Sequence, residues 1–168
     1  MADPVNDVIL ATIKTRLEAI TIANGYAFNV GTVAKPDRDS DQWIPRQNSI
    51  YIETEEETEN ESLMCPGNPP RIGFDLPVLI HGYCKQLDFD TAEVAAYDLG
   101  PISENRMAAE IQKAITNNDA GSWHTFGGYA KYARFATKMQ FDEPGWDGAT
   151  VRLVVSYRVS ELDATAVG

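Results

Sequence analysis

The chain has 168 residues, of which 43% are hydrophobic and 23% charged, and its formal net charge is −11. These values predict one globular domain over residues 1–168 and exclude a largely disordered chain. The excess of acids excludes binding to a nucleic-acid backbone or an anionic membrane by simple charge attraction. No apolar run in the sequence reaches the roughly 20 residues that a membrane-spanning helix needs. The opening MADPVNDVIL carries acids where a secretory signal carries basic residues, which predicts a cytoplasmic product.

The first predicted element is an amphipathic helix that begins near Asp3 and ends before Gly25. Asp3 can cap it, Pro4 suits its first turn, and Gly25 can adopt the left-handed conformation that ends helices. Arg16 and the neighbouring polar residues are expected mainly off the apolar face. The apolar positions at helical spacing are Val5, Val8, Ile9, Ile13, Leu17 and Ile20. A single apolar face predicts a helix packed on a sheet.

Alternating apolar and polar positions predict five strands. They cover residues 26–33, 49–54, 71–84, 133–141 and 151–159. In the first of them Tyr26, Phe28 and Val30 are expected to share one face.

The third strand contains Pro77, which cannot donate a ladder hydrogen bond. Its presence predicts that this strand lies at a sheet edge or carries a bulge at that residue.

A second helix is predicted over residues 103–117, with Ser103 as its cap and a short helical turn at 91–97 before it. Its buried side is expected to hold Met107, Ala108, Ile111, Ala114 and Ile115. The order of elements is therefore helix, three strands, helix, two strands. This order predicts an α+β fold, in which a mostly antiparallel sheet of about five strands carries two helices on one face.

Acidic residues concentrate in one segment. Residues 37–62 hold nine acids against two arginines, a net of −7 within the total of −11. Six of the nine positions from 53 to 61 are glutamates: Glu53, Glu55, Glu56, Glu57, Glu59 and Glu61. Because like charges repel and resist burial, the run predicts a loop or hairpin tip that projects from the body over about residues 53–70.

One segment resembles the start of a calcium-binding loop. Asp37, Asp39 and Asp41 have the spacing of its first ligands. Gln42 stands where that loop needs glycine, and Asn48 stands where it needs the closing glutamate. The segment is therefore expected to be a solvated loop.

Other candidates for chemistry are equally weak. His81 and His124 have no third ligand at useful spacing, which predicts two ordinary histidines and no metal site. Cys65 and Cys84 have no local catalytic signature and are expected to be reduced thiols. Basic and aromatic residues alternate over 126–135 (FGGYAKYARF), which favours a strand over a base-stacking surface. No catalytic residue or cofactor is expected, and the chain is predicted not to be an enzyme.

Several stretches carry a family resemblance. NGYAFNVGTV follows the first helix, and an acidic loop and a proline precede a strand in DSDQWIPRQNSIYIETEEE. A strand ending in HGYC, a helix in ISENRMAAEIQKAI and a last strand in VRLVVSYRVSE follow. Over about residues 4–160 this series resembles the tail terminator (tail completion) proteins of long-tailed bacteriophages. QWIPRQNSIYIE departs from the pattern, in which the proline leads more directly into the strand.

The resemblance implies a structural virion protein at the head-proximal end of the tail. Such a protein forms a ring, usually a hexamer, on the last ring of the tail tube protein. The ring ends tube polymerisation and contacts a neck or head-completion protein. Genome DNA passes through it without specific binding, and neither a cofactor nor a membrane is involved.

In such a ring the glutamate run is expected to face the channel, where it would repel phosphates, or the adjacent subunit, with plain solvent as the alternative. Six copies near one annulus would repel one another, so higher salt is expected to favour assembly.

Two other functions remain open on the sequence. One is a neck or head-completion connector of the same particle. The other is a small cytoplasmic enzyme with scattered site residues, which a monomer with a deep polar pocket would favour.

Overall fold

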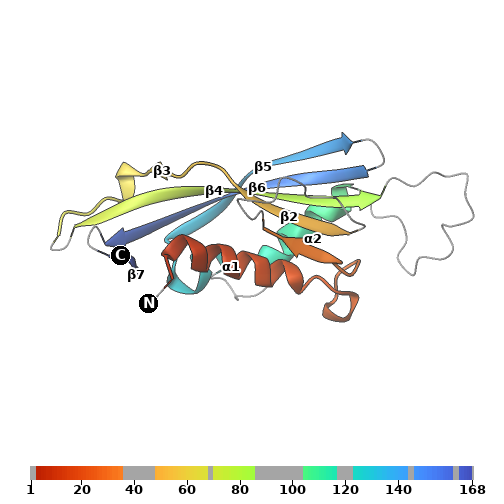
Figure 1. Ribbon diagram of the computed structural model, residues 1–168, viewed down its shortest axis with the longest axis horizontal. Coiled ribbons are helices and arrows are strands. Elements are labelled where there is room, and N and C mark those ends of the chain that lie inside the picture. The colour runs from red at the N-terminus through yellow and green to blue at the C-terminus, as the bar shows by residue number, and fades with distance from the viewer. Residues whose placement is uncertain are drawn as a thin grey trace, which may run out of the picture.

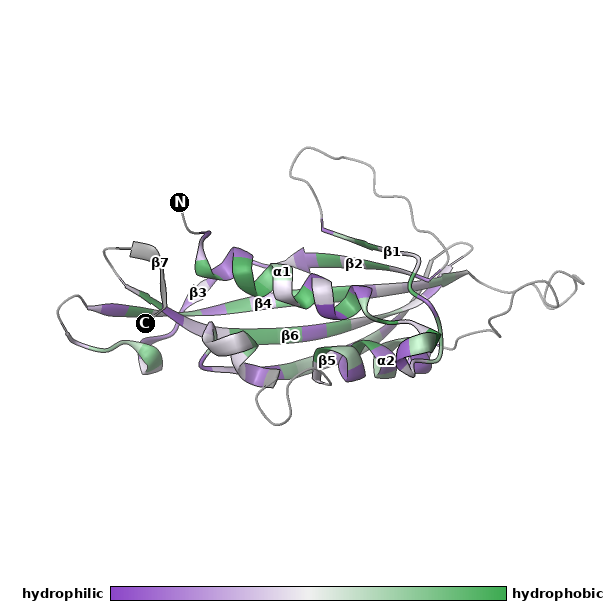
Figure 2. Cartoon of the chain, turned by 90° about the horizontal axis from the view of Figure 1, so that it is seen from below, coloured by the Kyte–Doolittle hydropathy of each residue, from purple (hydrophilic) through white to green (hydrophobic). Residues whose placement is uncertain are grey.

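The computed structural model describes residues 3–35, 48–67, 70–85, 104–116, 123–143, 146–160 and 163–167. In these ranges one sheet of seven strands carries α1 (Val5–Glu18) and α2 (Glu104–Thr116) on the same face (Figures 1 and 2). The mostly antiparallel sheet confirms the predicted α+β class. The calcium-like triplet at 37–41, the turn expected at 91–97 and the proposed cap at 103 lie outside the described residues.

The sheet has the strand order β1-β2-β4-β6-β5, with β3 also paired to β4 and β7 also paired to β6. All pairs are antiparallel except β1 with β2. The strands are β1 (Thr32–Ala34), β2 (Ser49–Thr54), β3 (Thr58–Glu59), β4 (Arg71–Lys85), β5 (Tyr132–Glu143), β6 (Trp146–Ser160) and β7 (Asp163–Val167). Within the described ranges, neither helix has the length and apolar character needed to cross a bilayer.

The core lies between the helices and one face of the sheet. Every second residue of β4 and β6 points into it, as the alternation predicted. The fully buried side chains of this face include Val78, Ile80, Val151, Leu153 and Val155. Gly82 lets α2 approach closely, because a Cβ there would lie 2.5 Å from Cγ of Met107. The five apolar residues predicted for the buried side of α2 are all buried.

The ends of α1 differ from the prediction. Pro4, not Asp3, holds the cap position, and no side chain caps the helix. The helix stops at Glu18, and a separate 3₁₀ turn follows at Ile22–Asn24. Gly25 does take the left-handed conformation, with φ of 83°, but it ends this short turn.

The strand predicted over residues 26–33 is wrong for most of its length, since β1 holds only Thr32–Ala34. The backbone before it bonds back to the residues that follow the first helix instead. The amide of Tyr26 donates to the carbonyl of Thr21, and that of Val30 donates to the carbonyl of Ile20. Tyr26 and Phe28 are still buried, and two buried residues separated by one position give the same alternation in the sequence as a strand does.

Pro77 does not mark an edge strand, because β4 lies in the middle of the sheet. Its carbonyl accepts from the amide of Glu55, so its nitrogen faces that same side, where β2 has ended. Thr54 pairs with Val78 and Thr58 with Asp75. Three residues of the neighbouring segment therefore stand opposite two of β4. A bulge is present, but it lies in the segment between β2 and β3 that faces Pro77, not in β4.

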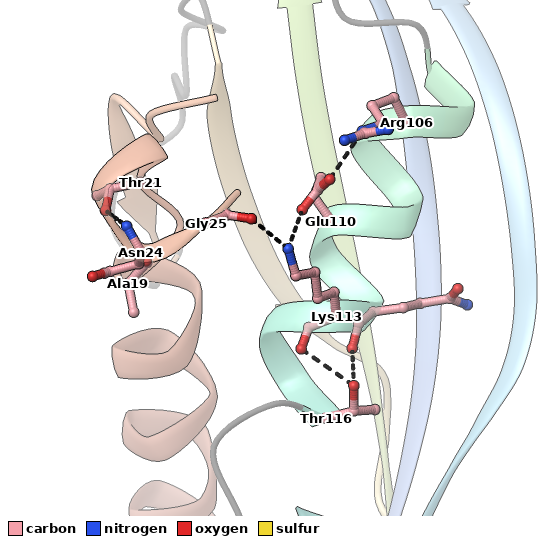
Figure 3. A network of polar contacts seen from close by, with 9 residues as sticks. Ala19, Thr21, Asn24, Gly25, Arg106, Glu110, Lys113 and Thr116 are labelled. Carbon is pink, nitrogen blue, oxygen red and sulfur yellow. Dashed lines mark hydrogen bonds and ion pairs between the residues drawn. The ribbon is translucent and has the colours of Figure 1, made fainter. Parts of the chain in front are cut away.

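A polar network joins α2 to the segment after α1 (Figure 3). Glu110 is only 4% exposed and pairs with Arg106 at 2.9 Å and with Lys113 at 3.6 Å. Lys113 also donates to the carbonyl of Gly25 at 2.6 Å and lies over the ring of Tyr26. The network fixes the left-handed turn against the second helix.

Arg16 is buried, contrary to the expectation that it lies off the packed face. It is 4% exposed, and its Nη1 donates to the carbonyl of Ile115 at 2.8 Å. Its guanidinium lies 4.7 Å from the ring centre of Phe126. One cation thus ties α1 to the end of α2 and to the segment before β5.

Candidate functional surface

The six glutamates lie on the β2 side of the sheet, past the residues that pair with the edge strand β1, and we call them the acidic edge (Glu53, Glu55, Glu56, Glu57, Glu59 and Glu61). Glu53 lies near the end of β2, Glu59 lies in the short β3, and Glu61 is the first residue of a 3₁₀ turn. The run was predicted to be a projecting loop or hairpin tip over about 53–70; it lies instead along the first arm of the hairpin that β3 forms with β4, and it is not a loop. Backbone pairing of β3 with β4 and the side-chain contacts of Glu53, Glu55 and Glu57 hold it to the body despite its charge.

The bulge divides the acidic edge between the two faces of the sheet. Glu53 pairs in register with Leu79 and shares the open face, the one without helices. Glu59 pairs with Phe74 and lies on the face of the helices. Because side chains alternate along a strand, two glutamates of equal parity reach opposite faces only if one extra residue lies between them.

On the open face, His81 joins the acidic edge to the centre of the sheet. Its Nε2 lies 3.3 Å from Oε2 of Glu53, and its Nδ1 lies 2.9 Å from the hydroxyl of Thr150. The ring of Tyr51 stacks at a tilt beside it. Desolvation, and then the charge of Glu53, raise the pKa of Tyr51.

Glu55 and Arg152 form the next pair along this face. Nη2 of Arg152 lies 2.5 Å from Oε2 of Glu55, and Nε lies 3.1 Å from the same oxygen. Both side chains are more than one third exposed, so solvent screens the pair.

Asp75, Asn60 and Ser156 form a third polar group on the open face, just after the end of β3. Asp75 accepts from the hydroxyl of Ser156 at 2.5 Å and from Nδ2 of Asn60 at 2.9 Å. Gly73 lets the 3₁₀ turn that holds Leu63 pack closely on β4, because a Cβ at Gly73 would lie 2.3 Å from Cβ of Leu63. The polar side chains of the open face thus bond mainly to one another.

Glu57 turns toward the helices. Its Oε1 accepts from the hydroxyl of Tyr157 at 2.9 Å and from Nδ2 of Asn6 at 3.0 Å. Burial first, and then the charge of Glu57, raise the pKa of the Tyr157 hydroxyl.

A cleft of about 920 Å³ lies between the start of α1 and the bulge. Its charged residues are one lysine, Lys35, and four acids: Asp7, Glu55, Glu56 and Glu57. Lys35 pairs with Asp7 at 3.6 Å.

The two histidines lie in different elements, and the two cysteines are not bonded to each other. His81 lies in β4 and His124 lies in the 3₁₀ segment Trp123–Gly128. Cys65 and Cys84 are both free, and they lie near opposite ends of β4. Burial raises the pKa of the Cys84 thiol to about 11, with Asp147 and Glu104 adding to the effect. Among the described residues, no three His, Cys, Asp or Glu side chains come together as a metal site.

The opposite edge of the sheet is basic up to Phe141, after which Asp142 and Glu143 end β5. The alternation over 126–135 predicted a strand there but not the charge of this edge. Between Lys131 and Phe141 the chain has no acid. We call its three cations, Lys131, Arg134 and Lys138, the basic edge; all three are exposed. In the described structure, β5 pairs only with β6, so its outer backbone is unpaired. The absence of acids in a chain of charge −11 was the available signal.

Comparison of the sequence with protein-family models and with curated proteins gave no match.

Proposed function

We propose that this protein is the tail terminator of a long-tailed bacteriophage and forms a ring, most simply a hexamer, on the end of the tail tube. In this role it ends tube polymerisation and joins the tail to the neck. The observation that carries the proposal is one sheet whose two edges differ in charge, the acidic edge along β2 and β3 and the basic edge along β5. A subunit with two different side surfaces suits a closed ring, in which every subunit uses both.

The resemblance in element order supports the same function. The helix, the central strands, the second helix and the two last strands are present in the expected order. The polar side chains of the open face are engaged with one another, as in Asp75 with Ser156 and Glu55 with Arg152, which is typical of a structural surface.

The decisive experiment removes the gene from the phage and images the particles. A tail terminator predicts tails of uncontrolled length, and particles of the intact phage should show a ring of this protein at the head-proximal end. Tails of normal length that fail to join heads would instead indicate a neck or head-completion connector. A single copy of the chain, or a place in the capsid shell, would contradict both.

A further inference from the structure

We propose that adjacent subunits of the ring meet through the acidic edge of one copy and the basic edge of the next. The inference rests on the proposed function for the ring and adds the surfaces that close it. The occupant of each edge is a second copy of this chain.

The first observation is that both edges hold charges without partners. Glu56, Glu59 and Glu61 make no side-chain hydrogen bond or ion pair within the described residues, and all three are exposed. The same holds for Lys131, Arg134 and Lys138 on the opposite edge. Among the described residues, three carboxylates without a partner therefore lie at one edge of the sheet and three cations without a partner at the other.

The second observation is that the two edges lie at opposite ends of the same row of the sheet. Arg134 pairs with Val154, and Val154 pairs with Pro77. Pro77 in turn faces the bulge at Glu55. Three strand spacings of about 4.8 Å separate the ends of this row, so the edges point away from each other (Figure 2). One subunit cannot satisfy its own charges across this row, whereas a neighbour placed beside it can.

The third observation is that β5 is a long strand with an unpaired outer edge in the described structure and with apolar side chains beside its cations. Met139 is 53% exposed and Tyr132 is 38% exposed, two of the four large exposed hydrophobic residues among those described. Proteins usually shorten, cover or charge such an edge, because it invites pairing with another chain. Here the cations select an acidic partner, and this protein carries one on its opposite edge.

The contact predicts the sign of the salt dependence. Opposite charges across the contact are screened by salt, so raising the ionic strength from 0.05 to 0.5 M should weaken association tenfold or more. If the glutamates of neighbouring copies instead lay close together, salt would strengthen association. That outcome would overturn the proposal.

Charge reversal tests the contact directly. Variant A carries Arg134→Glu and Lys138→Glu, and variant B carries Glu56→Lys and Glu59→Lys. Each alone should lose assembly in sedimentation. An equimolar mixture should assemble again with A and B alternating in equal numbers, because the unchanged edges of A and B match each other and so do their reversed edges. A chain with all four changes should assemble again, and Lys14→Glu, on the exposed side of α1, should behave like wild type.

If the free protein associates too weakly for sedimentation, zero-length carbodiimide cross-linking tests the same contact. Coupling at high concentration in an equal mixture of ¹⁴N and ¹⁵N protein should join peptides containing Lys138 to peptides containing Glu56 or Glu59, with mixed isotope labels. Absence of these products, or failure of A and B to associate, would overturn the contact. If particles show the ring but the reversals change nothing, the contact is wrong and the tail function stands. If the reversals act as expected but the protein is not at the tail, only the function is wrong.

Discussion

The hydroxyl of Tyr157 donates a hydrogen bond of 2.9 Å to the carboxylate of Glu57, a residue 100 positions earlier in the chain. Tyr157 is only 3% exposed, and the same carboxylate oxygen accepts from Asn6 of the first helix. One glutamate of an acidic surface run thus joins β6, α1 and the segment between β2 and β3.

This arrangement predicts very different roles for two neighbouring glutamates. Glu57→Ala leaves the buried Tyr157 hydroxyl without its acceptor and should lower the free energy of unfolding by about 1–3 kcal/mol. Glu56→Ala removes an exposed side chain without a described partner and should change it by less than about 0.5 kcal/mol. Urea unfolding of both variants measures the difference. Equal effects would mean that the Tyr157 contact contributes nothing.

The same pair predicts a loss of stability at alkaline pH. Burial and Glu57 raise the pKa of Tyr157, so the folded protein keeps the phenolic proton after the unfolded chain releases it near pH 10. The unfolded state then binds fewer protons, and the free energy of unfolding falls as the pH rises above about 10. Tyr157→Phe should make this fall shallower in unfolding curves measured at pH 9, 10 and 11. A slope that is unchanged in Tyr157→Phe would contradict the assignment.

Arg16 offers a test of a buried cation against an exposed one on the same helix. Arg16→Met removes the donor to the carbonyl of Ile115 and the contact with Phe126, and it should cost about 2–4 kcal/mol of stability. Lys14→Met, at a position 46% exposed, should cost less than about 0.5 kcal/mol. Thermal unfolding of the two variants gives the comparison, and similar midpoints would show that Arg16 is not a packing residue.

The two cysteines should differ in reactivity. Burial raises the pKa of Cys84 from 9.0 to about 11, so its thiolate fraction at pH 8 should be about 100-fold below that of a thiol with the ordinary value. Iodoacetamide should label the half-buried Cys65 in the native protein and should label both residues after unfolding. A Cys65→Ala variant isolates the Cys84 signal. Rapid native labelling of that variant would mean that the end of β4 opens readily.

The regular parts of the fold could be predicted because one period governs each of them. The alternation in β4 and β6 and the helical spacing in α2 follow directly from which side is buried. Tyr26 and Phe28 imitated this alternation, because two buried aromatics separated by one residue look the same in a strand and in a turn that folds back. Sequence patterns report burial but do not report the hydrogen-bond partner.

The acidic surface was misread for a related reason. Composition shows that six glutamates cannot enter a core together, and this holds in the structure. It does not show that Arg152, His81 and Tyr157 lie beside three of them, since these partners come from strands that follow later in the chain. The burial of Arg16 was missed in the same way, because its partner Ile115 lies 99 residues away.

The bulge opposite Pro77 makes the length of the glutamate run as important as its charge. If the bulge is retained, loss of one residue at Glu56 would shift β3 by one position along β4. Every side chain from Glu57 to the end of β3 would then turn to the other face of the sheet. Replacing any exposed glutamate by glutamine keeps this phase, whereas a deletion that removes the same single charge does not. We therefore expect the fold to tolerate a single substitution of an exposed glutamate at this edge far better than an insertion or deletion.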